Sequence, residues 1–180
     1  MRFLTPLFII AALLCLAYPM RSFAAAPATT QPSSEPNGSD IAHQFDLETA
    51  ALGGERSVHD GVLTIVIPRT DLWVQNEMGT IPSAAGIECR FYFYRCPCGK
   101  DRVVGQFAVA DYELNDVIDV LRNGQMDIVS ISPMFLDEKP RLMELRFQSE
   151  GNAEGLAGIL QSAIRTFAPN RPPANNQVNH

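Results

Sequence analysis

The sequence predicts a small α+β domain in which an antiparallel sheet carries helices on one face, as in a ferredoxin-like or related two-layer sandwich. Five or six segments have the β-branched or alternating pattern of strands, and two have a strong helical repeat. From residue 103 to residue 167 these segments follow the order strand, helix, hairpin, helix. About 120 residues lie between the polar ends of the chain, which is enough for one hydrophobic core and not for two.

The first predicted elements are a short helix and two strands. Residues 45–52 can form a helix that ends at Gly53-Gly54, because glycine readily adopts the left-handed conformation of a helix stop. Residues 62–67 are a β-branched run closed by Pro68, which predicts a buried strand. A short strand over residues 72–75 precedes the turn residues that follow.

A β-hairpin is predicted next, from residues 89–95 and 103–110. The first segment alternates strictly, so that Phe91 and Phe93 share one face. The other face carries Arg90, Tyr92 and Tyr94. Aromatic and β-branched residues favour strands, and the intervening Pro-Cys-Gly-Lys-Asp segment supplies the turn.

The last part of the domain is predicted to hold two helices around two strands. Asp111 can cap a helix that ends at Asn123-Gly124, and its apolar residues recur at helical spacing. Strands are predicted at residues 126–132 and 141–148, and in the second one apolar and polar residues alternate, which indicates one buried and one polar sheet face. Asn152 caps the final helix.

The chain ends are predicted to lie outside the folded domain, which spans residues 45–167. Residues 1–24 have the basic start, the apolar run and the small-residue cleavage site of a secretory signal peptide, with cleavage after Ala24. Residues 25–44 have the composition of a flexible linker, and residues 168–180 that of a disordered tail. We therefore expect an exported protein, periplasmic or secreted.

A lipid anchor at Cys15 is the alternative to cleavage at Ala24. Lipoprotein processing requires a small residue before the cysteine, whereas Leu14 occupies that position. Cleavage after Ala24 is therefore the prediction that the sequence favours, and it leaves no stable membrane span in the mature chain.

The charge of the mature chain argues against a nucleic-acid partner. Removal of residues 1–24 takes away Arg2 and Arg21 and no acidic residue, so 14 basic residues become 12 against 20 acidic ones, a net charge of −8. Such a chain repels phosphate backbones. The expected partner is a small molecule, an envelope component or another protein.

Cys96 and Cys98 are candidates for a disulfide, or for a soft-metal or redox site, at the tip of the predicted hairpin. Cys89 lies seven residues before Cys96, about 23 Å along a strand at ~3.3 Å per residue, which is beyond disulfide reach. The histidines show no ligand spacing, and neither a Gly-rich phosphate loop nor a known hydrolase motif occurs. No cofactor is predicted, and the His59-Asp60 pair is interpreted as a polar turn.

Several segments together resemble the LppY/LpqO-type family of exported domains of unknown function. The resemblance covers about residues 45–165 and rests on Pro68-Arg69-Thr70-Asp71-Leu72-Trp73-Val74, Gly79, Ile81-Pro82, Glu113-Leu114-Asn115, Asn123-Gly124 and Pro140-Arg141. It implies that the retained residues Arg69, Asp71, Glu113 and Asn115 either line a pocket or hold turns and helix starts together.

The family pattern also contains a histidine cluster that this sequence lacks. The resemblance places Ser132 and Met134 at a His-x-His pair, Arg146 at a further strand histidine and Gln106 at an aspartate. None of the three residues at the histidine positions can replace imidazole in metal binding or in proton transfer near neutral pH. The histidine chemistry is therefore predicted to be lost.

The polar face of the late strands is the candidate binding surface. By alternation, Ser132 shares a face with Ser130, and Arg146 with Glu144 and Gln148, so that an arginine among hydroxyls could receive a carboxylate or a sugar acid. The alternative is a merely solvated sheet face. The sequence thus leaves two functional hypotheses: a non-catalytic binding domain, or a metal- or thiol-dependent enzyme that uses Cys96 and Cys98.

Overall fold

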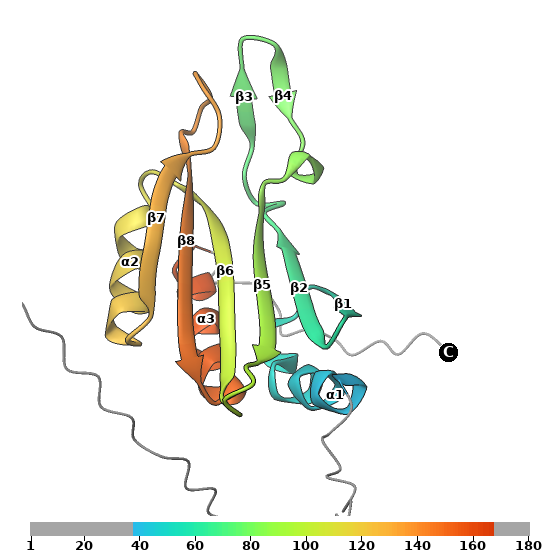
Figure 1. Ribbon diagram of the computed structural model, residues 1–180. Helices are drawn as coiled ribbons and strands as arrows, with labels where there is room; N and C mark the ends of the chain where they lie inside the picture. Colours follow the sequence, from blue (N-terminus) through green and yellow to red (C-terminus); the bar gives the residue numbers. More distant parts are fainter. Residues whose placement is uncertain (1–37, 168–180) are drawn as a thin grey trace, which may run out of the picture. The chain divides into compact units, whose positions relative to one another are not determined.

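Figure 1 shows the computed structural model, which describes residues 38–167 of the chain. The predicted signal peptide, the predicted tail and most of the predicted linker lie outside these described residues. Within residues 38–167, no helix has both the length and the hydrophobicity needed to cross a membrane.

The domain is built on one six-stranded sheet in which every neighbouring pair of strands is antiparallel. Its strands, in spatial order, are β1 (Glu55–His59), β2 (Val62–Pro68), β5 (Glu88–Arg95), β6 (Asp101–Ala110), β8 (Leu142–Gly151) and β7 (Asp127–Pro133). A separate hairpin of β3 (Val74–Asn76) and β4 (Gly79–Ile81) extends beyond one end of the sheet (Figure 1). The helices are α1 (Gly38–Glu48), α2 (Leu114–Asn123) and α3 (Ala153–Phe167). The predicted α+β class is confirmed.

Part of the topology is that of a ferredoxin-like sandwich. β6, α2 and β7 form a split unit, because β8 inserts between the two strands and pairs antiparallel with both. α3 then follows β8. The strand on the other side of β6 is β5, which precedes β6 in a hairpin instead of following α3 as the ferredoxin-like order requires. The fold is therefore not ferredoxin-like itself but a related two-layer sandwich, which was the alternative that the sequence predicted.

The helices pack on one face of the sheet (Figure 1). Buried phenylalanines belong to the hydrophobic core between the helices and the sheet. Phe91, Phe107 and Phe147 come from three adjacent strands, and their ring centroids lie 5.1–5.9 Å apart. Gly105 faces the same layer: a Cβ there would lie 2.9 Å from both Phe91 and Phe147, so that only glycine leaves room for the two rings. Within residues 38–167, no helix lies over the opposite face of the sheet.

Two segments differ from the sequence prediction near the start of the domain. The predicted helix at 45–52 is instead α1, which begins at Gly38, followed by a 3₁₀ turn at Ala50–Leu52. Residues 38–44 of the predicted linker are thus helical. The sequence analysis also missed β1, which forms a hairpin with β2 through Asp60 and Gly61, both at positive φ as a type I′ turn requires.

The caps of the two later helices differ from each other. Asn152 caps α3 as predicted, since its Oδ1 accepts a hydrogen bond from Gly155 N at 2.8 Å. Asp111 does not cap α2, because its carboxylate accepts a hydrogen bond from Tyr112 N and α2 begins only at Leu114, after Glu113. The prediction for Asp111 is therefore wrong, because a turn intervenes between β6 and α2.

Candidate functional site

The open face of the sheet carries a row of polar side chains that crosses four strands. Arg90 of β5 lies opposite Gln106 of β6, which lies opposite Arg146 of β8, which lies opposite Ser130 of β7. Residues directly opposite each other on neighbouring strands project to the same face. We call these four residues the arginine row.

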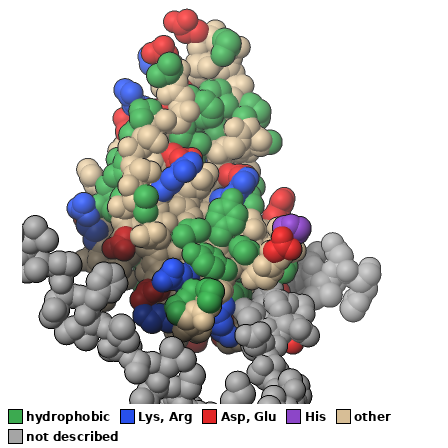
Figure 2. All heavy atoms as spheres, in the orientation of Figure 1, with side chains coloured by type: hydrophobic (Ala, Val, Ile, Leu, Met, Phe, Trp, Pro, Cys, Tyr) green, Lys and Arg blue, Asp and Glu red, His purple; other side chains and the backbone are tan. Residues whose placement is uncertain are grey.

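A second row lies beside the first on the same face. It consists of Tyr92, Val104, Gln148 and Asp127, again paired from β5 to β7. We call these four residues the tyrosine row. Figure 2 views the molecule in the same orientation as Figure 1 and shows basic side chains next to hydrophobic side chains on this face.

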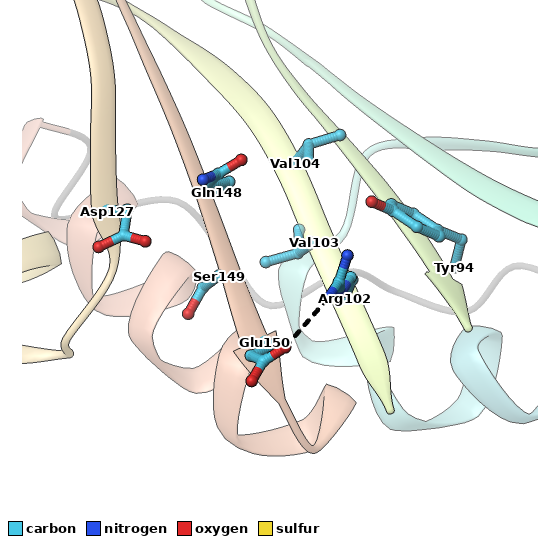
Figure 3. A pocket seen from close by; sticks show the side chains of 8 residues that line it. All are labelled: Tyr94, Arg102, Val103, Val104, Asp127, Gln148, Ser149 and Glu150. Atoms are coloured by element: carbon cyan, nitrogen blue, oxygen red, sulfur yellow. Dashed lines mark hydrogen bonds and ion pairs between the residues drawn. The ribbon is translucent and has the colours of Figure 1, made fainter. Parts of the chain in front are cut away.

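Two adjoining hollows lie over these rows. The larger hollow, of about 400 Å³, is lined by Tyr92, Val104, Gly105, Gln106, Val129, Arg146, Phe147 and Gln148, and we call it the Arg146 groove. The smaller hollow, of about 190 Å³, lies around Tyr94, Arg102 and Glu150 (Figure 3). Val104 and Gln148 line both, so the two hollows are adjacent. In Figure 3 the Tyr94 hydroxyl and the Gln148 amide both point into the smaller hollow.

A β-bulge shapes one wall of the Arg146 groove. The register between β7 and β8 shifts between Ile128 and Ser130, so that Val129 is an extra residue in β7. Val129 is 59% exposed and lines the groove. The bulge therefore places an apolar side chain beside Arg146, where regular pairing would not.

Both arginines of the row are held by a glutamate of their own strand. Arg146 Nε donates to Glu144 Oε1 at 2.6 Å, and the Arg146 side chain remains 56% exposed. Arg90 is paired with Glu88, and its side chain is 40% exposed. A hydrogen bond with Tyr92 raises the pKa of Arg90; partial burial opposes this rise, and the contact with Glu88 adds to it. Both guanidinium groups are thus fixed in position but open to solvent.

Two of the six predicted site residues lie on this open face. Arg146 belongs to the arginine row, and Ser132 lies opposite Glu144 in the next row of the sheet. Gln106, where the resemblance places an aspartate, also belongs to the arginine row. Met134 lies elsewhere: it packs against a small apolar cluster with Val74 and Leu142. Three of the four positions at which this chain departs from the family pattern therefore converge on one face.

Three other predicted site residues, Arg69, Asp71 and Glu113, form an ion cluster around the buried Arg69 side chain, just after the end of β2. Arg69 has no exposed surface and donates to Asp71 at 2.9 Å, to both oxygens of Glu113 at 2.9 and 3.0 Å, and to the Ala108 carbonyl at 2.6 Å. Its guanidinium also lies 4.0 Å from the centre of the Phe167 ring. Burial acts to lower the pKa of Arg69, but the contacts with Asp71 and Glu113 outweigh it, so that the pKa is raised.

This Arg69 cluster joins five elements, the first of which is β2, since Arg69 directly follows its last residue. The backbone N of Arg69 donates to Ile87 O before β5, Glu113 also accepts from Ala110 N at the end of β6, and Glu113 directly precedes α2. Phe167 ends α3. Of the two roles that the resemblance implied for these residues, the geometry is that of residues holding turns and a helix start together. Asn115 is exposed near the start of α2, on the helical layer, and belongs neither to this cluster nor to the open face.

Cys96 and Cys98 are joined to each other as a disulfide at the tip of the β5–β6 hairpin. Their Cα atoms are 5.1 Å apart, and Cys89 is buried in β5, outside this disulfide. With both sulfurs bonded, neither cysteine is a thiolate that could bind a metal or act as a nucleophile. Among residues 38–167, no group of three or more His, Cys, Asp or Glu side chains has the geometry of a metal site.

Sequence reasoning did not include Arg90, Tyr92 or Gln106 in the candidate site. The alternation of residues 89–95 places Arg90 and Tyr92 on one face, but it does not say which strand lies next to them. Gln106 was noted only as a departure from the family pattern. The register of β5, β6 and β8 is what brings these side chains to Arg146.

No curated protein and no solved structure matches this chain. The family model described as Domain of Unknown Function (DUF1259) matches residues 48–166, which run from the last residue of α1 almost to the end of α3. This match covers the six-stranded sheet, the β3–β4 hairpin and two of the three helices. The chain therefore belongs to the family Domain of Unknown Function (DUF1259).

Proposed function

We propose that this chain is an exported, non-catalytic domain that binds a small molecule in the Arg146 groove. The observation that carries the proposal is a hollow of about 400 Å³ at Gln106 and Arg146 of the arginine row, on the sheet face that none of the helices in residues 38–167 covers. Ligand sites are concave and combine apolar walls with a few placed polar groups, and their volumes are about 300–1,000 Å³. Here Tyr92, Val104 and Val129 supply apolar surface, while Gln106, Arg146 and Gln148 supply hydrogen bonds.

The position of the groove supports a binding role for these residues. The groove lies on regular strands, which hold side chains more firmly than loops do. Arg146, which lines the groove, and Arg90, at the other end of the arginine row, keep exposed surface although each has a glutamate partner. A solvated sheet face needs neither a hollow nor a β-bulge that turns Val129 towards it.

Two further parts of the proposal rest on the sequence. The signal-peptide pattern of residues 1–24 supports export, and the ordered motifs support a relationship to the LppY/LpqO-type exported domains. The absence of catalysis is proposed because Ser132, Gln106 and Arg146 occupy positions where the resemblance places an acid and histidines. None of the three can exchange a proton near neutral pH as imidazole does.

A library of small polar metabolites, screened by thermal shift on the whole chain, tests this proposal. Val129→Trp fills the groove from an exposed position, and Val58→Trp is the matched control because Val58 is 50% exposed on β1, outside the groove. A compound that binds the groove raises the Tm of the parent and of Val58→Trp, but not that of Val129→Trp.

The same screen can contradict the proposal in two ways. If no compound raises the Tm, or if every hit protects Val129→Trp as well as the parent, the groove is not the binding site. Each hit is also incubated with the protein and recovered by mass spectrometry. Chemical conversion of a hit would overturn the non-catalytic part of the proposal and leave the binding part standing.

A further inference from the structure

The arginine row has the geometry of a clamp for one acidic group. Arg90 and Arg146 lie on β5 and β8, with only β6 between them. Neighbouring strands are ~4.8 Å apart, so the two backbones are separated by roughly 10 Å. An arginine side chain is long enough for both guanidinium groups to reach a ligand placed over Gln106, which lies directly between them.

Both arginines retain hydrogen-bonding capacity beyond their glutamate partners. A guanidinium carries five N–H donors. Among the described residues, the hydrogen bonds of Arg146 go to Glu144 alone, through Nε, which leaves both terminal nitrogens for a ligand. Arg90 Nε is buried and has no hydrogen-bond partner among residues 38–167, which is an uncommon state for a buried donor. A carboxylate lying across the row can reach the terminal nitrogens of Arg146 and the part of the Arg90 side chain that is exposed, but not the buried Arg90 Nε.

The charge around the row disfavours a ligand with two negative charges. Glu88 and Glu144 each contact one of the two arginines, so the four charged groups sum to zero. A dianion such as a phosphate ester would meet two carboxylates without a net positive charge to offset them. A planar carboxylate carries one charge and matches the fork of a guanidinium through two parallel hydrogen bonds.

The neighbouring tyrosine row suits the ring of a sugar. Tyr92 and Val104 present flat apolar surface next to the two arginines, and Gln148 and Asp127 present amide and carboxylate groups at the far end of the same row. The hydroxyls of a sugar can donate and accept hydrogen bonds, and its C–H faces pack on aromatic rings. The smaller hollow around Tyr94 is adjacent to this point and leaves space for a second sugar unit.

From these observations we infer that the ligand is an acidic sugar, whose carboxylate is clamped by Arg90 and Arg146 over Gln106 and whose ring lies on Tyr92. This inference rests on the proposed function, because it names the class of ligand for the same groove. It adds Arg90, which does not line the groove itself, to the residues that contact the ligand. It also assigns the carboxylate to the arginine row and the ring to the tyrosine row.

Isothermal titration calorimetry on the whole chain tests the inference with matched sugars. Glucuronate and galacturonate are compared with glucose and galactose, which lack the carboxylate, and with glucose 6-phosphate, which carries a dianion. We expect at least one uronate to bind about tenfold or more tightly than its neutral parent and than the phosphate ester. Arg90→Gln and Arg146→Gln should each weaken uronate binding about tenfold, and Arg122→Gln, on the exposed surface of α2, should leave it unchanged.

The outcomes separate this inference from the proposed function. Failure of both uronates to bind, equal binding of uronate and neutral sugar, or tighter binding of the phosphate ester overturns the acidic-sugar inference. The proposed function is judged separately by the library screen with Val129→Trp. Because both arginines are partly exposed, the Gln variants should remain folded. NMR chemical-shift changes on adding uronate, centred on residues 90, 106 and 146 of the parent, locate the site without any variant.

Discussion

The domain contains two sets of arginines whose surroundings are opposite. Arg69 is completely buried, and protein groups from several elements surround its guanidinium: two carboxylates, a carbonyl oxygen and the Phe167 ring. Arg90 and Arg146 lie on the open sheet face, each with one glutamate of its own strand and with about half of the side chain exposed. The donors of Arg69 are bonded to other groups of the protein, whereas Arg90 and Arg146 have donors that are not bonded within residues 38–167.

The difference in burial and hydrogen bonding between these arginines distinguishes structural residues from candidate binding residues more clearly than the sequence motifs of the family resemblance do. Arg69, Asp71 and Glu113 were candidates for a binding site because they belong to the motifs that carry the family resemblance. Their geometry joins loops, strand ends and helices, which is a task that any member of the fold has to perform. The residues suited to a ligand are those at which hydrogen-bonding capacity, exposure and a hollow coincide, and two of them, Gln106 and Arg146, are positions at which this chain departs from the pattern that the resemblance implies.

Replacement of Arg69 should produce the largest loss of stability. Arg69→Met removes the cation from a buried cluster and leaves Glu113, whose side chain is 11% exposed, without its charge partner. Breaking a buried ion pair in this way costs about 3–5 kcal/mol. Arg146→Met should change the free energy of unfolding by no more than about 0.5 kcal/mol, as is usual for surface substitutions. Urea denaturation of both variants measures the difference, and equal losses would contradict the contrast drawn between the two arginines.

Removal of one glutamate from each set sharpens the comparison. Glu113→Gln keeps the shape of the side chain but removes the charge that pairs with Arg69, and we expect a loss of about 1–3 kcal/mol. Glu144→Gln should leave stability almost unchanged and should strengthen uronate binding, because Arg146 is freed and the site gains a net positive charge. Denaturation and calorimetry on the same two proteins measure both effects. Weaker uronate binding by Glu144→Gln would show that Glu144 positions Arg146 more than it competes for it.

The sequence predicted the layers of the domain because alternation and helical repeats report burial directly. Phe91 and Phe93 share one face as predicted, and this face is buried; Leu145 and Phe147 are buried whereas Arg146 and Gln148 are exposed. The missed strand β1 has no such pattern: its one aliphatic residue, Val58, is half exposed at the sheet edge. An edge strand with one exposed aliphatic residue gives no periodic signal. Asp60-Gly61, a type I′ turn sequence, was the one local clue.

The candidate site could be predicted only in part, because it depends on contacts between distant segments. Alternation within residues 141–148 identified the polar face with Arg146, and this needed only local information. The position of Arg90 next to Gln106 and Arg146 depends on the strand order β5-β6-β8, which brings Arg90 near Arg146 although more than fifty residues separate the two in the sequence. The burial of Arg69 likewise depends on α2 and α3 packing over the sheet end. Neither can be derived from the spacing of residues along one segment.

Gly105 and Gln106 are neighbours in β6 that should respond very differently to alanine. A Cβ at Gly105 would lie 2.7 Å from the Arg90 carbonyl oxygen and 2.9 Å from the Phe91 and Phe147 rings, so Gly105→Ala overpacks the core face. We expect a loss of about 1–3 kcal/mol. Gln106→Ala, on the open face, should change stability by no more than about 0.5 kcal/mol while weakening uronate binding. Thermal unfolding and calorimetry measure the pair, and a stable Gly105→Ala would mean that β5 shifts to admit the methyl group.

The smallest expected effect concerns the ion pair of Lys100 and Glu150, in which both side chains are exposed, whereas each arginine discussed above has a mostly buried glutamate partner. Lys100 Nζ lies 2.6 Å from Glu150 Oε1, and this hydrogen bond, with a smaller contribution from Arg102, lowers the pKa of Glu150 from its ordinary 4.5. Because the pKa in the folded protein is lowered, the stabilising effect of the pair is present above 4.5 and is lost as the pH falls through the lowered pKa. Lys100→Met should move the Glu150 pKa back towards 4.5, which an NMR titration of the Glu150 carboxyl measures. An unchanged pKa in that variant would assign the whole shift to Arg102, whose guanidinium lies 3.3 Å from the other oxygen of Glu150 at the rim of the smaller hollow.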